Sequence, residues 1–234
     1  MSRLPLLAAL CIAAPLAAQD SLVATAGLGF VNTAGNTDLT SLAVNEKVTY
    51  VTGPWSFTQR FAVVYARTGG VTSTSQWKAG LRVDRPVAAP LGMFALGGFE
   101  RNRFAGLESR FEEAAGITAR VLGSNGNTLD IEAGATLNHE TPVGGTRFTF
   151  AGGRAAANYK RDLTEAAYFT VEAEFLPNFK TTDDYRLSGD VALVAPISNV
   201  IATKLTYSAL YDHLPEPGFQ TTDRIFTASI QFTF

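Results

Sequence analysis

The chain has 234 residues, with 19 Lys and Arg against 21 Asp and Glu, and only 17% of its residues are charged. This balance excludes the basic surface that a nucleic-acid-binding protein needs, and a single Cys excludes an internal disulfide framework. Glycine is frequent (21), and 16 Phe are spread along the chain with many Thr and Val, a profile that favours an all-β protein.

Residues 1–18 are predicted to be a secretory signal peptide. Arg3 is followed by an apolar run that ends in small residues, so cleavage is expected after Ala18. A short membrane anchor is disfavoured, because the run is too short and no stop-transfer charges follow it. Cys11 does not follow the small residue that a lipoprotein signal requires. Removal of the peptide leaves 19–234, with 18 basic and 21 acidic side chains, as an exported chain without disulfides.

After the signal peptide, segments of about ten residues alternate between polar and apolar side chains, with turn-forming residues between them. No stretch of about 18 uncharged apolar residues follows the signal, so a transmembrane helix is not expected. Together with less regular segments, the pattern predicts about twelve strands. The clearest alternation covers 55–65, 77–84, 129–138, 167–175, 185–194, 201–211 and 226–234.

Two architectures fit this alternation, a soluble β-sandwich and a membrane β-barrel whose apolar face points outward to lipid. The segments are long for sandwich strands but match the length needed to cross a bilayer at a tilt. Aromatic residues gather near strand ends, as the interface girdles of a barrel require. They are Tyr50, Trp55, Trp77, Tyr185, Tyr211 and Phe234.

Connection lengths also alternate along the chain. Short turns are predicted at 52–54, 122–127, 161–165 and 196–199, and longer loops at 34–38, 67–75, 139–145, 178–184 and 213–222. Short turns on one side and long loops on the other are typical of a barrel in the outer membrane with both termini in the periplasm. Two places break the pattern: Glu46 falls on an apolar face, and the parity changes near 152–153, which predicts a β-bulge there.

Charged side chains on the polar faces are expected to line the lumen, because in lipid each costs a few kcal/mol. Two roles stay open for them: they fill and rigidify the barrel, or they line a narrow pore. Their mixed signs disfavour a strongly selective funnel, and twelve strands give a lumen of intermediate width. The candidate lumen charges are Arg60, Lys78, Arg82, Asp84, Arg110, Glu112, Arg120, Asp130, Glu132, Arg154, Glu172, Glu174, Arg186, Asp190 and Lys204.

No catalytic, cofactor-binding or metal-ligating motif is found, and an enzyme is not predicted. The two histidines, His139 and His213, lie at loop borders. An outer-membrane hydrolase would need a serine such as Ser208 near His213, and a lumen serine with a separate loop histidine is the favoured interpretation. Asp183 and Asp184 suggest either an external cation site or, preferably, a solvated acidic loop.

Three stretches carry a family resemblance: "AGNTD" at 34–38, "FERNRFAGLESRF" at 99–111, and "YDHLPEPGFQTTD" at 211–223 with the strand that follows. In order and spacing the chain resembles a bacterial family of salt-induced outer membrane proteins of unknown function. The resemblance implies an outer-membrane barrel and no established reaction. Asn102 and Ser109 depart from the family's pattern, so nothing is carried over to these two positions.

The last segment alternates with apolar residues at every second position and is expected to close the barrel against the first strand. Its outward residues are predicted to form the signal read by the outer-membrane barrel assembly machinery, and they include Phe226, Ile230, Phe232 and Phe234. The sequence therefore predicts one antiparallel up-and-down transmembrane barrel over 19–234, embedded in outer-membrane lipid. Its hypothesised role is passive, as a small-solute channel or an envelope-integrity component linked to salt or osmotic stress. The alternatives are a surface receptor or adhesive barrel acting through its loops and, last, an outer-membrane hydrolase.

Overall fold

The computed structural model describes residues 20–33 and 39–234. The predicted signal peptide at 1–18 and the stretch at 34–38 lie outside these residues. Within the described part, twelve strands and one short 3-10 helix follow one another along the chain. Among the described residues, no helix is both long and apolar enough to cross a membrane.

The strands are 10 to 18 residues long, enough to cross a bilayer when tilted. The short helix, η1, covers Arg103–Ala105 between the fifth and sixth strands. The strand bounds are β1 Ser21–Thr33, β2 Leu39–Thr52, β3 Trp55–Thr68, β4 Val71–Ala88, β5 Leu91–Asn102, β6 Leu107–Ser124, β7 Asn127–Pro142, β8 Phe148–Asp162, β9 Tyr168–Pro177, β10 Tyr185–Pro196, β11 Ile201–Asp212 and β12 Thr222–Thr233.

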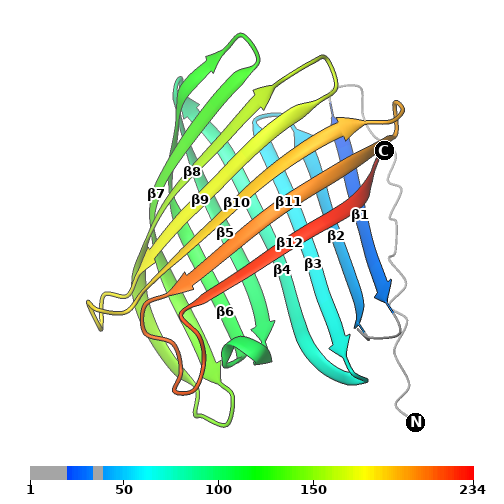
Figure 1. Ribbon diagram of the computed structural model, residues 1–234. Helices are drawn as coiled ribbons and strands as arrows, with labels where there is room; N and C mark the ends of the chain where they lie inside the picture. The colour runs from blue at the N-terminus through cyan, green and yellow to red at the C-terminus, as the bar shows by residue number, and fades with distance from the viewer. Residues whose placement is uncertain (1–19, 34–38) are drawn as a thin grey trace.

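Every strand pairs antiparallel with its neighbours in the sequence, and β12 pairs with β1, so the sheet forms a closed barrel (Figure 1). Ala24 and Phe234 exchange two backbone hydrogen bonds at this seam, with N to O distances of 3.1 and 2.9 Å. The pairing of β12 with β1 runs from Thr25 opposite Thr233 to Leu28 opposite Ile230. Every strand therefore has a partner on both sides, which is what a sheet in lipid requires. The predicted up-and-down barrel and its strand number are confirmed.

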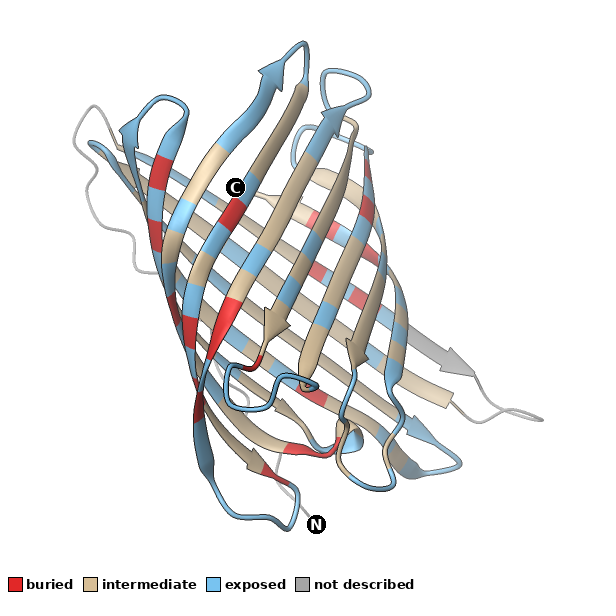
Figure 2. Cartoon of the chain, turned by 90° about the vertical axis from the view of Figure 1, so that its left-hand side faces the viewer, coloured by how far each residue is buried: buried red, intermediate tan, exposed pale blue. Residues whose placement is uncertain are grey.

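The side chains divide between an apolar outer face and a polar inner face. Exposed and less exposed residues alternate along the strands (Figure 2). Leu81 is 65% exposed and Phe226 67% exposed, whereas Glu132 and Asn138 are buried at 7% and 1%. This is the reverse of a water-soluble sheet and is the arrangement of a barrel surrounded by lipid.

Short turns lie on the side of the barrel that holds the C-terminus, and the larger connections lie mainly at the other end (Figure 1). The turn between β6 and β7 uses Asn125 and Gly126, both with positive φ, as a tight hairpin turn requires. The long loop predicted at 67–75 is wrong. The chain turns over Gly69 and Gly70, both with positive φ, and β4 already starts at Val71, because two glycines suffice to reverse the strand.

The bulge predicted near 152–153 is also wrong. The pairing of β7 with β8 keeps one register from Asn127 to Glu140. The change in the sequence pattern has another cause: Phe148 and Phe150 point inward, while their neighbours on the outer face of β8 are small, namely Ala151, Gly153, Ala155 and Ala157.

Glu46 and Glu113 lie on the outer face, where the rest of the pattern is mostly apolar. Glu46 sits opposite Ala26 and Phe61, as its position in the alternation predicts. Glu113 sits between Gly97 and Leu137. Carboxylates are tolerated on a lipid face better than Lys or Arg, so neither residue conflicts with the assignment of the two faces.

Candidate functional site

An ion pair crosses the whole lumen. The Nη1 atom of Arg60 on β3 lies 3.1 Å from the Oε2 atom of Glu172 on β9. These strands are six positions apart in the ring of twelve, on opposite walls of the barrel. The pair therefore identifies the inner face of both strands and narrows the passage between them.

A second cluster centres on Glu132, whose side chain is only 4% exposed. Its carboxylate accepts hydrogen bonds from Arg82 at 3.0 Å, Arg154 at 3.2 Å and Asn158 at 3.1 Å. The guanidinium of Arg82 stands 4.5 Å above the ring of Phe94. A buried carboxylate is held in this way because its desolvation must be offset by several charged partners. The same arginines reach two further predicted residues, Asp84 and Glu174.

A third cluster lies nearer the loop end. Arg110 pairs with Glu140 at 2.8 Å and with Glu100 at 3.3 Å, and Glu100 also pairs with Lys78 at 3.4 Å. Arg186 reaches across the lumen from β10 to β6 and β7. There its guanidinium lies 3.7 Å from the carboxylate of Glu112 and 3.2 Å from the side-chain oxygen of Asn138. Opposite charges are thus matched on the neighbouring strands β4 to β7, and Arg186 adds one ion pair between strands that are not neighbours.

The remaining candidate charges also lie on the inner face. Arg120 and Asp130 pair at 2.8 Å on the turn side, where Arg120 is 56% exposed. Asp190 accepts a hydrogen bond from the Ser208 hydroxyl, and Lys204 lies opposite Ser229 on β12. The structure therefore brings most of the predicted lumen charges into contact with one another, in three clusters and one rim pair.

Sequence reasoning missed several lumen charges, among them Lys47, Glu100 and Glu140. Nearer the ends of the strands, Lys160, Asp212 and Asp223 also lie on the inner face and were not predicted. Glu100 was missed because the segment around it has two equally plausible faces, and Glu140 because it was assigned to a loop that the structure shows as the end of β7. Lys47 was missed because its neighbour Glu46 breaks the apolar pattern of the outer face. In the structure Lys47 pairs in register with Arg60. Glu140 alternates with Asn138 and Thr136, which was the signal available in the sequence.

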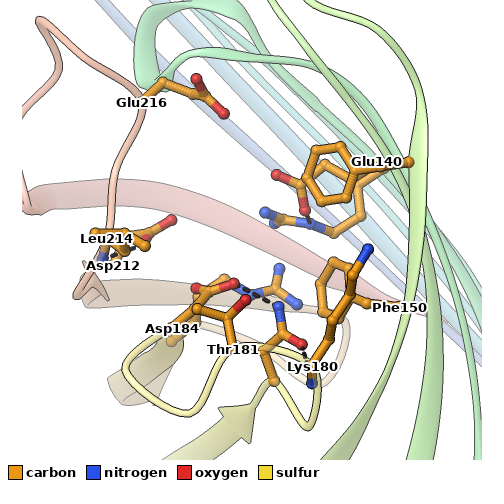
Figure 3. Close-up of a pocket in the computed structure, with 12 residues that line it drawn as sticks. Glu140, Phe150, Lys180, Thr181, Asp184, Asp212, Leu214 and Glu216 are labelled. Atoms are coloured by element: carbon orange, nitrogen blue, oxygen red, sulfur yellow. Dashed lines mark hydrogen bonds and ion pairs between the residues drawn. The ribbon is translucent and has the colours of Figure 1, made fainter.

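A cavity of about 240 Å³ opens at the loop end of the lumen. Figure 3 shows its lining, with Glu140 and Phe150 from the barrel wall facing Glu216 from the β11–β12 loop. Phe148 and Phe150 stack at 5.9 Å between ring centroids. The cavity thus forms a vestibule with one aromatic side and both signs of charge. Its full lining is Arg110, Glu140, Phe148, Phe150, Asn178, Lys180, Thr181, Asp184, Arg186, Asp212, Leu214 and Glu216.

The β11–β12 loop reaches across the mouth of the barrel. A Cβ atom on Gly106, at the end of η1, would lie 3.0 Å from both Glu216 and Phe219 of this loop. The β5–β6 and β11–β12 connections stand on opposite sides of the ring, so their contact narrows the entrance. The neighbouring Asp184 accepts a hydrogen bond from Asn178 at 2.6 Å. The described residues hold no group of three His, Cys, Asp or Glu placed to bind a metal.

Ser208 and His213 do not form a catalytic pair. Ser208 donates its hydrogen bond to Asp190 inside the lumen. His213 stacks on Tyr185 at 4.6 Å between ring centroids and contacts the Tyr211 hydroxyl at 2.8 Å. These tyrosines lie on the outer face of the wall, opposite Phe175 and Leu187, so the serine and the histidine are on different sides of the sheet.

The predicted outward residues of the last strand lie on the outer face. Phe226 is 67% exposed, Ile230 38% and Phe234 75%. Phe232 follows the same alternation and pairs with Ile201 and Ala26. The strand thus presents an apolar row to the surroundings and also forms one side of the seam.

The chain is similar to one protein family and, in its fold, to solved structures. A model of the family described as "Protein of unknown function, DUF481" matches residues 26–234. The NanC porin superposes with a TM-score of 0.50 and 8% identity, over 91% of this chain and 98% of that one. The translocator domain of the autotransporter NalP from Neisseria meningitidis superposes with a TM-score of 0.47 and 11% identity, over 91% of this chain and 87% of that one. An anion-selective porin from Comamonas acidovorans superposes with a TM-score of 0.42 and 8% identity, over 92% of this chain and 99% of that one. No curated protein matches the sequence.

Proposed function

The chain belongs to the DUF481 family of proteins of unknown function, and we propose that it is a narrow passive channel for small solutes in the outer membrane. The observation that carries the proposal is a closed barrel with an apolar outer face and a charged lumen that opens into a vestibule. Water and polar solutes are stabilised by such a lumen, whereas lipid is stabilised by the outer face. The fold shared with the NanC porin supports the proposal.

The channel is proposed to be narrow because charged side chains meet across it. The Arg60–Glu172 pair joins opposite walls, and the cluster around Glu132 fills the space in front of β7 and β8. Twelve strands enclose less room than the sixteen of an open porin. Since both signs of charge line the passage, the selectivity expected from charge alone is modest.

Replacement of Arg60 with alanine should widen the passage. The variant loses the side chain that meets Glu172 across the lumen, and both partners are about half exposed, at 55% and 41%, so the cost in stability is expected to be under about 1 kcal/mol. Single-channel conductance in planar bilayers should rise above that of the parent protein.

The matched control for this experiment is Arg120→Ala, which removes an arginine of equal exposure at the rim, where the lumen is not crossed. Its conductance should stay close to that of the parent. Equal conductance of Arg60→Ala and Arg120→Ala would show that the cross-lumen pair does not limit the passage.

Two other roles have some support. The ion-pair network also fits an envelope-integrity component, in which it serves only to stiffen the wall. The vestibule and the β11–β12 loop fit a surface receptor or adhesive barrel, and exchange of this loop would abolish partner binding without changing conductance. A hydrolase has no support from the positions of Ser208 and His213, and we propose no catalytic role.

We also propose that the outer-membrane assembly machinery reads the apolar row of β12. The exposure of Phe226 and Phe234 supports this. Phe234→Ser should slow the appearance of folded protein in cells, while the purified variant refolds into vesicles at close to the parent rate. If Phe234→Ser folds equally slowly in cells and in vesicles, the substitution weakens the seam of the barrel and not its recognition by the assembly machinery.

A link to salt or osmotic stress is the remaining part of the proposal. Its motivation is the resemblance of the stretches at 99–111 and 211–223 to salt-induced outer membrane proteins. Transcript level after a shift to high-salt medium is the measurement that decides it, and an unchanged level would remove the link.

A further inference from the structure

We propose that Lys47, Arg60 and Lys204 form a binding site in the lumen for the anionic group of a small solute, a carboxylate or a phosphate. This inference rests on the proposed channel function and deepens it by naming the class of solute. The site lies in the half of the barrel nearer the short turns, since Lys204 is three residues from the start of β11 and Lys47 is five from the end of β2.

Charge is distributed unevenly between the two walls of the lumen. On β11, β12, β1, β2 and β3, the described inward side chains include only three cations, Lys47, Arg60 and Lys204, while the inward acids of these strands, Asp212 and Asp223, lie at their loop ends. The other wall, β4 to β10, holds the second and third clusters, in which carboxylates pair with arginines. A solute in this part of the lumen therefore meets a cationic wall.

Two of the three cations have no carboxylate partner. Within the described part of the chain, no carboxylate oxygen lies within 4.0 Å of the Nζ atom of Lys47 or Lys204. By contrast, Lys78 and Lys160, which also face inward, are paired at 3.4 and 2.5 Å. Unpaired ammonium groups directed into one passage form a place where an anion gains favourable interactions.

One carboxylate, that of Glu172, interacts with all three cations. Glu172 bonds to Arg60 and interacts at longer range with Lys47 and Lys204. Lys204 also interacts with Asp190, but that carboxylate already accepts the Ser208 hydrogen bond. Three cations against two partly engaged carboxylates leave a local excess of positive charge, which the anionic group of a solute would neutralise.

Neutral polar groups surround the cations. Ser229 lies opposite Lys204, and Gln231 lies opposite Ala202 one step along the same face; both side chains are buried at 6% exposure. The Gln231 amide is a donor suited to the remaining oxygens of a carboxylate or phosphate, whereas the Ser229 hydroxyl already donates to the backbone carbonyl of Lys204 at 3.4 Å. Because Glu172 competes for the same cations, binding is expected to be weak enough for the solute to leave, as conduction requires.

The test uses the refolded barrel and inorganic phosphate as the probe. Isothermal titration in detergent measures phosphate binding to the parent, to Lys47→Gln/Lys204→Gln and to Lys78→Gln, whose lysine is already paired. Planar-bilayer recording of the same proteins measures the reversal potential in a KCl gradient. The double variant should bind phosphate about tenfold more weakly, since charge-assisted hydrogen bonds are lost. Its reversal potential should shift toward cation selectivity, and Lys78→Gln should match the parent in both assays.

The two proposals fail in different ways. Conducting bilayers with equal phosphate affinity and equal reversal potential in all three proteins would overturn the anion site and leave the channel standing. A silent bilayer would overturn the channel, and the titration would then decide the site alone. If Lys78→Gln lost as much phosphate affinity as the double variant, the effect would come from the total charge of the lumen, and the anion site would also be overturned.

Discussion

Arginine in place of Leu205 should prevent the chain from folding into a membrane, whereas arginine in place of the next residue, Thr206, should be tolerated. Leu205 lies on the outer face between Leu193 and Ala228 and is 38% exposed. A guanidinium at this depth of a lipid-facing surface costs about 2–4 kcal/mol. Against a typical stability of about 5–15 kcal/mol, this is a large loss.

Thr206 provides the matched control because it belongs to the same strand and points the other way. It lies between Ala192 and Thr227 on the inner face, on the same side as Asp190, so an arginine there stays in water and gains a carboxylate nearby. Heat-dependent gel mobility after refolding into vesicles measures the folded fraction. If the two variants fold equally well, the assignment of outer and inner faces is wrong.

Removal of the Glu132 carboxylate should be the most damaging change inside the lumen. Glu132→Ala takes a partner away from both Arg82 and Arg154 in a nearly buried position. Breaking a buried ion pair in this way typically costs 3–5 kcal/mol. We expect the free energy of unfolding to fall by about 3 kcal/mol, the lower end of this range. The loss is limited because Asp84 and Glu174 still contact the two arginines.

Asp130→Ala is the comparison, since it breaks an ion pair whose arginine is more than half exposed. Such a pair contributes about 1 kcal/mol or less. Urea titration of the protein refolded in vesicles gives the free energy of unfolding of both variants. Similar losses for Glu132→Ala and Asp130→Ala would mean that the central cluster is as well solvated as the rim.

The fold was predictable because alternation is a local property. Each strand shows its two faces within a few residues, as Leu129 and Ile131 against Asp130 and Glu132 do, and a chain with many such strands and apolar outer faces has few stable solutions. The long loop predicted at 67–75 failed because of two residues. Gly69 and Gly70 make a tight turn where a long loop was expected.

The inner face was predictable, but the partners across the lumen were not. Arg60 and Glu172 are 112 residues apart in the chain, and their meeting depends on the strand number and the stagger of the whole ring. No local pattern carries that information. The same holds for Arg186, which reaches Asn138 on a strand three places away.

Passage of solutes through this lumen is tested most directly by planar-bilayer recording of the refolded, wild-type protein. We predict discrete conductance steps that are small for a barrel of twelve strands, because the Arg60–Glu172 pair and the cluster at Glu132 occupy the passage. A bilayer that stays silent, with protein whose gel mobility still changes on heating, would show that solutes do not pass through the lumen.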